Sequence, residues 1–315
     1  MEQSWKVAIN RQREELSWLL REPLTHLAHR CEPAWMDRER LNAVLQAGFS
    51  DIPHCTFLYV VNTDGIQVCD NICSDGLLPG HFERDRSRRP YMREVVPSYG
   101  FLLSEAYISL RAHRPSLTAL HIIRIDGKAV GYLGADFDLR DLPVTARLYE
   151  EPSHWRQIKG DPSIRSTVFL QNRTESQLDR NMEQAFSILE ELFTDRGVFQ
   201  AVIHFSSSRA TVWFLDDPYR YRILNHEALA DPDICLAHPL QSYPTDAIIP
   251  QSSIRSIFKE MRQLRMADET IYLRSASINI FNGLISLTFS CDGSHYMRYD
   301  EFLEKNMAFW FGGTP

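Results

Sequence analysis

Residues 121–139 read HIIRIDGKAVGYLGADFDL and indicate a β-hairpin. Two runs rich in β-branched and aromatic residues, 117–125 and 129–138, flank the dipeptide Asp126-Gly127. An Asp-Gly pair between such runs is typical of a tight hairpin turn, because the turn needs backbone conformations that these residues accept. The sequence therefore predicts two long antiparallel strands joined at this dipeptide.

The chain before this hairpin predicts two helices. Apolar residues recur at mostly helical spacing through the first 30 residues, with charged residues between them. Pro23 lies inside this pattern and leaves open a kink or a split. A second, shorter helix is predicted over residues 36–47, ended by Gly48.

A shorter hairpin is predicted between the second helix and the long strands. Residues 56–62 and 66–69 are rich in β-branched residues and flank the turn signal Thr63-Asp64-Gly65. Residues 139–147 read as a short amphipathic helix that closes the unit. The first domain is therefore predicted over residues 1–147, with helices and an antiparallel sheet.

Residues 148–173 are poor in periodicity and are predicted to be a linker, because they contain Pro152, Gly160 and Pro162. A strong amphipathic helix follows, with Thr174 and Gln177 predicted as a capping box and Gly197 just past its end.

The second domain is predicted over residues 174–315 as a further α+β unit with antiparallel hairpins. Ser206-Ser207-Ser208-Arg209 separates two strand-like runs, and residues 254–266 read as a helix. Asn282-Gly283 joins the strands predicted over 270–281 and 284–290, and Asn-Gly is the strongest short hairpin signal. Its role is open: a second module of the same kind as the first domain and an unrelated oligomerisation or partner-binding module both fit.

Composition excludes several functional classes. The chain has 315 residues, 44% hydrophobic and 24% charged, which is typical of a folded globular protein. The net charge of −7 gives no electrostatic reason to expect nucleic acid. No nucleotide-binding glycine motif occurs. No apolar run approaches the length of a membrane span, so we expect no membrane partner and a cytoplasmic protein with reduced cysteines.

Three short segments carry a resemblance. They are Arg88-Arg89-Pro90-Tyr91, Glu105-Ala106-Tyr107-Ile108-Ser109 and residues 131–139, GYLGADFDL. In these segments and in the order of its elements, the stretch of residues 1–147 resembles the family of Cache domains (also called PDC domains), which are PAS-like sensors. The family often has Arg-Pro-Trp-Tyr, a tyrosine segment and a late strand with glycine and aspartate. The second domain could be a second PAS-like module.

The resemblance implies a ligand pocket on one face of the sheet. Its arginine and aromatic positions, which bind carboxylate in amino-acid sensors, match Arg89 and Tyr91. Its amine-binding tyrosine and last aspartate match Tyr107 and Asp136, while Ser109 stands where a second aspartate is expected. Such residues suit the task independently, because arginine binds a carboxylate bidentately and aspartate holds an ammonium group.

The departures from the family bear on the ligand. Tyr91 replaces tryptophan, Ser109 replaces an aspartate, and Arg84 replaces a tyrosine five residues before Arg89. The side of the pocket that binds the amine therefore has one negative charge fewer, and the approach to the pocket has one positive charge more. A carboxylate or an undemanding zwitterion is therefore expected more than a primary α-amino acid.

The sequence thus predicts a cytoplasmic sensor that binds a small organic carboxylate or zwitterion through Arg89, Tyr91, Tyr107, Ser109 and Asp136. It predicts no cofactor, no metal site and no catalytic residue, so the protein is not expected to be an enzyme. The resemblance implies a homodimer, and with no recognisable output module the signal would leave through an unknown protein partner.

Two other classes stay open. One is a scaffold or oligomerisation protein whose pocket is vestigial. The other is an enzyme with its active site in the second domain, using His204, Asp216, Asp292 or His295. His26, His29 and Cys31 could begin a zinc site, but no second cluster of ligands completes it.

Overall fold

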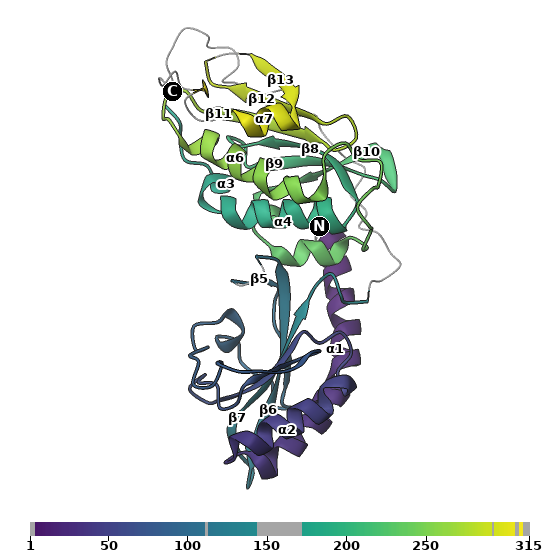
Figure 1. Cartoon of the computed structure of the whole chain (residues 1–315), viewed down its shortest axis with the longest axis vertical. Helices are drawn as coiled ribbons and strands as arrows, with labels where there is room; N and C mark the ends of the chain where they lie inside the picture. The colour runs from purple at the N-terminus through teal and green to yellow at the C-terminus, as the bar shows by residue number, and fades with distance from the viewer. Residues whose placement is uncertain (1–3, 111–112, 144–171, 292, 306–308, 311–315) are drawn as a thin grey trace. The chain divides into compact units, whose positions relative to one another are not determined.

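The computed structural model describes residues 4–110, 113–143, 172–291, 293–305 and 309–310 (Figure 1). The chain divides into two compact units, Met1–Leu148 and Tyr149–Pro315. All but the last two residues of the predicted linker lie outside the described residues. The prediction of an α+β fold with a long N-terminal helix and antiparallel sheets is confirmed.

Unit 1 begins with helix α1, Ser4–Cys31, which runs through Pro23 without ending there. Leu16, Leu20 and Leu24 are at most 1% exposed, and the helix lies against the sheet. Helix α2, Arg38–Gly48, begins two residues later than predicted. The reason is local, because the Asp37 side chain accepts a hydrogen bond from the Arg40 backbone N–H and caps the helix.

The sheet of unit 1 is antiparallel, in the order β3-β2-β1-β7-β6-β4, with the short β5 also on β6. The predicted central hairpin is confirmed, and both Asp126 and Gly127 have positive φ in its turn. The strands are β1 (Phe57–Asn62), β2 (Asn71–Cys73), β3 (Gly76–Leu78), β4 (Phe101–Leu103), β5 (Tyr107–Ile108), β6 (Pro115–Ile125) and β7 (Lys128–Asp138).

Two predictions in unit 1 are wrong. Residues 66–69 form only isolated bridges, and β1 pairs with β2 instead. Here the Val60 N–H bonds the Cys69 sulfur rather than a strand carbonyl. Residues 139–143 form a turn instead of a helix, since the Asp138 carboxylate binds the Arg140 backbone and guanidinium. Residues 144–147 lie outside the described residues.

Gly131 allows β7 to approach β1 closely. A Cβ at this position would overlap the Val61 carbonyl oxygen and the Trp35 ring. A backbone oxygen in a sheet cannot move aside as a side chain can. We therefore expect Gly131→Ala to lower the free energy of unfolding of unit 1 by about 1–3 kcal/mol, measured by urea denaturation. An unchanged midpoint and slope would contradict this packing.

Unit 2 has a second antiparallel sheet, in the order β10-β9-β8-β11-β12-β13. Both predicted hairpins are confirmed, β8–β9 and β11–β12, and β10 and β13 extend the sheet at its two edges. The strands are β8 (Val198–His204), β9 (Arg209–Phe214), β10 (Asp217–Leu224), β11 (Leu273–Asn279), β12 (Leu284–Phe289) and β13 (Ser294–Arg298).

The helices of unit 2 are α3 (Gln177–Arg180), α4 (Met182–Asp195), α5 (His226–Leu229), α6 (Ile254–Met266) and α7 (Tyr299–Glu304). The predicted capping box is wrong by two residues. Ser176 is the N-cap and Asp179 its reciprocal partner, because these two side chains bond each other's backbone N–H. Gly197 lies just past the C-cap of α4 with φ +75°, as predicted.

Candidate functional site

Unit 1 contains a cavity of about 100 Å³ at the end of β7 that carries Asp136. The local sequence explains its shape. Thr118 and Asp136 are direct partners on neighbouring strands, so their side chains share one face of the sheet. Gly134 lies on the same face two residues earlier, opposite Tyr59, and a Cβ there would collide with the Tyr59 ring. The glycine therefore lets Tyr59 cross β7 and reach Asp136.

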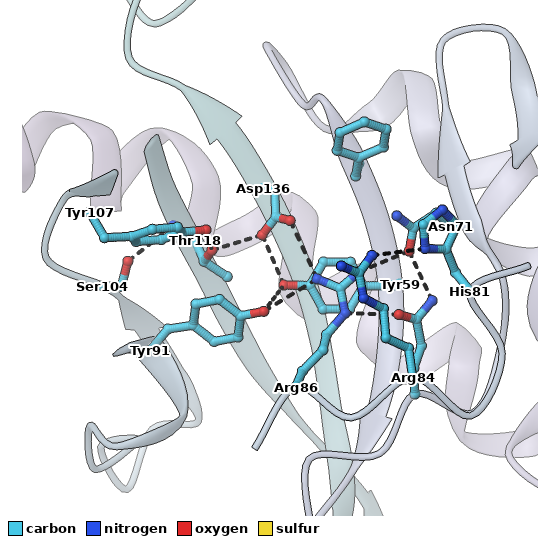
Figure 2. A network of polar contacts seen from close by, with 12 residues as sticks. Tyr59, Asn71, His81, Arg84, Arg86, Tyr91, Ser104, Tyr107, Thr118 and Asp136 are labelled. Carbon is cyan, nitrogen blue, oxygen red and sulfur yellow. Dashed lines mark hydrogen bonds and ion pairs between the residues drawn. The ribbon is translucent and has the colours of Figure 1, made fainter. Parts of the chain in front are cut away.

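Asp136 is the centre of this network (Figure 2). Its Oδ1 accepts hydrogen bonds from the Tyr59 hydroxyl at 2.8 Å and the Thr118 hydroxyl at 2.7 Å. Its Oδ2 lies 3.7 Å from Nη1 of Arg86. Burial raises the pKa of Asp136 above its ordinary value, although Arg86 and the two hydroxyls act in the opposite direction.

Arg86 forms the floor of the site. It is 5% exposed, and its guanidinium lies 3.6 Å from the centre of the Tyr59 ring. Its nitrogens donate to the Gln67 amide oxygen at 2.8 Å, to the Asn71 amide oxygen at 3.0 Å and to the Tyr91 hydroxyl at 3.3 Å. Because each of its three guanidinium nitrogens already donates a hydrogen bond to the protein, Arg86 is a structural cation that supplies charge to the cavity.

Three tyrosines line or support the site as neutral groups. The Tyr59 and Tyr91 hydroxyls are hydrogen-bonded to each other at 3.0 Å, and the Tyr107 hydroxyl bonds the Thr118 hydroxyl at 2.8 Å. Burial raises the pKa of Tyr59, Tyr91 and Tyr107, and the Asp136 carboxylate acts in the same direction. These phenols therefore stay protonated at neutral pH and act as hydrogen-bond donors.

Arg84 and Arg89 add two more guanidinium groups to the cavity wall. Arg89 is half-buried at the start of the short 3-10 helix η3, Pro90–Met92. Within the described residues its guanidinium makes no hydrogen bond or ion pair. Arg84 is more exposed and bonds Nδ1 of His81 at 3.1 Å.

All five residues that the sequence singles out line this one cavity: Arg89, Tyr91, Tyr107, Ser109 and Asp136. Tyr107 and Ser109 come with β5 and the loop after it, where Tyr107 pairs with Ser116. Whether they bind a ligand stays a prediction.

The sequence reasoning missed the buried part of the site. It gave Arg86 little weight, and Tyr59, Asn71 and Thr118 none. The arginines from Arg84 to Arg89 look alike in sequence, so the signal that singles out Arg86 is three-dimensional. The one local signal was Gly134, whose missing side chain makes room for an aromatic ring on the neighbouring strand.

Within the described part of the chain, the structure does not bring the candidates for a zinc site or the pair His204 and Asp216 together into a site. His29 bonds Glu32, Cys31 is buried, and the described residues contain no group of three potential metal ligands. His204 ends β8 and Asp216 follows β9, so they lie at opposite ends of β9, about 20 Å apart for six strand residues. Asp292 lies outside the described residues.

The chain is similar to some solved structures, at low sequence identity. No family model matches the chain. No curated protein matches it either. Among solved structures, it is similar to an extracellular ligand-binding receptor from Desulfohalobium retbaense, with 15% identity and a TM-score of 0.34 over 45% of this chain and 26% of that one.

Two other neighbours are ligand-binding domains of chemoreceptors. One, from Campylobacter jejuni, is in complex with 4-methylisoleucine; it has 16% identity and a TM-score of 0.35, over 45% of this chain and 61% of that one. The other, from Pseudomonas aeruginosa, is in complex with L-Gln; it has 20% identity and a TM-score of 0.32, over 44% of this chain and 53% of that one. The chain therefore covers between about a quarter and three fifths of these three proteins.

Proposed function

We propose that unit 1 is a sensor domain that binds a small organic carboxylate in the cavity beside Asp136. The observation that carries this proposal is Arg89, a half-buried guanidinium in the cavity wall that makes no side-chain hydrogen bond or ion pair within the described residues. A carboxylate can accept two parallel, charge-assisted hydrogen bonds from such a group. The hydroxyls of Tyr107 and Ser109, which line the same cavity, complete the polar wall.

A zwitterion is the second candidate, and Asp136 supports it. Its Oδ1 accepts hydrogen bonds from Tyr59 and Thr118, while Oδ2, among the residues that the structure describes, has only the long 3.7 Å contact with Arg86. An ammonium group could therefore approach Oδ2. The nearby guanidinium opposes a second cation, so the carboxylate end is expected to contribute more of the binding energy.

The remaining parts of the proposal come from the sequence. The protein acts in the cytoplasm by binding without turnover, and the ligand alters a contact with a second copy or a protein partner. A ligand can do this only by binding one conformation better than another. No described helix is long and apolar enough to cross a membrane.

A thermal-shift screen of the full chain against small carboxylates, amino acids, amines and inorganic anions tests the proposal. Occupancy at about 100 times the dissociation constant should stabilise the protein by about 2.7 kcal/mol. We expect carboxylates to raise the melting temperature and Arg89→Gln to remove the effect. The matched control is Arg88→Gln, which removes the same charge from an exposed neighbour outside the cavity wall.

Two outcomes would contradict this function. If no carboxylate stabilises the well-folded protein, the result favours the scaffold alternative. Stabilisation that persists in Arg89→Gln would place the binding site elsewhere on the chain.

A further inference from the structure

One turn of helix α1 holds the end of strand β4 through Arg13. Nη2 of Arg13 donates hydrogen bonds to two consecutive main-chain carbonyls, that of Leu103 at 3.0 Å and that of Ser104 at 2.6 Å. Both residues are buried, and they lie where β4 ends and the chain turns towards β5. Because buried carbonyls need a donor, Arg13 fixes the start of the segment that carries Tyr107 into the cavity wall.

Ser104 connects this contact to the cavity. It is 0% exposed; its Oγ accepts from the Thr118 backbone N–H at 3.0 Å, and its own N–H donates to the Thr118 carbonyl at 2.9 Å. The Thr118 hydroxyl donates its one hydrogen to Asp136 and therefore accepts from the Tyr107 hydroxyl. A continuous chain of hydrogen bonds thus runs from the cavity through Thr118 and Ser104 to Arg13, and Figure 2 shows its part from Asp136 to Ser104.

The same turn of α1 also holds the chain that leaves unit 1. Gln12, next to Arg13, is 3% exposed, and its amide nitrogen donates to the Pro143 carbonyl. Pro143 follows β7, which ends at Asp138, and is the last residue of unit 1 that the structure describes. Two neighbouring side chains of α1 therefore bind the cavity segment and the exit from unit 1.

We infer that this turn of α1 couples the cavity to the exit from unit 1, with Arg13 as the positioning residue. A change at Tyr107 or Thr118 shifts Ser104, and the carbonyls that Arg13 holds move with it. The inference rests on the proposed function for the ligand that would cause the change, but the coupling itself is present in the unliganded chain. Coupling is reciprocal, so a loosened α1 must also loosen the cavity segment.

Hydrogen–deuterium exchange of the unliganded full chain tests the coupling. Tyr107→Phe removes the hydroxyl that bonds Thr118 and keeps the aromatic ring. It should raise the exchange rate of α1 peptides over residues 9–16 about two- to tenfold, the effect of losing one neutral hydrogen bond. Peptides from α2 should not change, which excludes a general loosening of unit 1. Tyr132→Phe, which removes a hydroxyl from β7 four residues before Asp136, is the control and should leave α1 unchanged.

Arginine variants assign the path. The effect of Tyr107→Phe on α1 should vanish in an Arg13→Met background and persist in an Arg11→Met background, because Arg11 is an exposed residue of the same helix that pairs with Glu15. In the reverse direction, Arg13→Met should raise the exchange of β5 peptides about tenfold or more, since its donor is charged. If Arg13→Met does not fold, Arg13→Lys, which keeps the charge on a shorter side chain, should give smaller changes in the same directions.

Two results would overturn the inference. Unchanged α1 exchange in Tyr107→Phe would show that the cavity and the helix are not coupled. An equal effect of Tyr107→Phe with and without Arg13 would show that the coupling takes another route. Neither result bears on ligand binding, because no ligand is present, and failure of the thermal-shift screen would contradict the proposed function without affecting this coupling.

Discussion

Arg86→Met should lower the free energy of unfolding of unit 1 by about 3–5 kcal/mol, the usual cost of removing one partner of a buried ionic network. The guanidinium is 5% exposed and holds Gln67, Asn71 and Tyr91 through hydrogen bonds. Without it, the buried Gln67 amide oxygen loses its donor, the Asn71 amide oxygen keeps only the hydrogen bond from Gln67, and the Asp136 carboxylate loses its nearest cation.

Hydrogen–deuterium exchange along a urea gradient measures this loss, because peptides from β1 and β7 report on unit 1 alone. Arg88→Met is the matched control, an exposed arginine two residues away that should leave the exchange unchanged. The double variant Arg86→Met/Asp136→Asn should lose less than the two single variants together, since it removes both charges. Purely additive losses would show that Arg86 and Asp136 are not coupled, and an Arg86→Met protein as stable as the control would show that the network contributes nothing to stability.

In unit 2 the largest expected effect is at Asp179. Asp179→Asn should destabilise this unit by about 3–5 kcal/mol, because it leaves Arg265 as a buried cation with no full counter-charge. Both side chains are 0% exposed. Arg265 donates from Nε to Oδ1 at 2.9 Å and from Nη2 to Oδ2 at 2.7 Å. Its remaining terminal nitrogen donates to the Leu273 carbonyl at 2.9 Å.

This pair also makes unit 2 sensitive to acid. Burial acts to raise the pKa of Asp179, but hydrogen bonds from Arg265 and the Ser176 backbone outweigh it and hold the pKa below the ordinary value of 3.8. The stabilisation is therefore complete above the pKa of the unfolded chain and is lost as the pH falls through the folded value.

Exchange of β8 and β11 peptides, measured along urea gradients at several pH values below 5, follows this loss. In Asp179→Asn the acid-dependent part should be absent. Asp300→Asn, which breaks the exposed ion pair with Arg298, is the control and should match the parent protein. An unchanged acid dependence in Asp179→Asn would assign it to other carboxylates.

The local signals in the sequence predicted the strands well. Asp126-Gly127 and Asn282-Gly283 fix their hairpins because the turn conformation depends on those residues alone. Boundaries that depend on competing side chains were less predictable. Ser176 and Asp179 cap a helix that Thr174 could have begun, and nothing in the spacing distinguishes the two.

The site was predicted at its motifs and missed in its interior. Arg89, Tyr91, Tyr107, Ser109 and Asp136 line one cavity, as the family resemblance implied. The buried role of Arg86 depends on partners 15 to 50 residues away in the chain, which only the folded sheet brings together. Local sequence therefore could not show which arginine of the segment turns inward.

Calorimetric titration of the full chain and of Arg89→Gln with succinate and butyrate is the most direct test of a carboxylate site in unit 1. The account predicts saturable binding of at least one of these ligands, at one site per chain, weakened about tenfold or more by Arg89→Gln and unchanged by Arg88→Gln. No binding to the folded protein, or equal binding by the parent and Arg89→Gln, would contradict it.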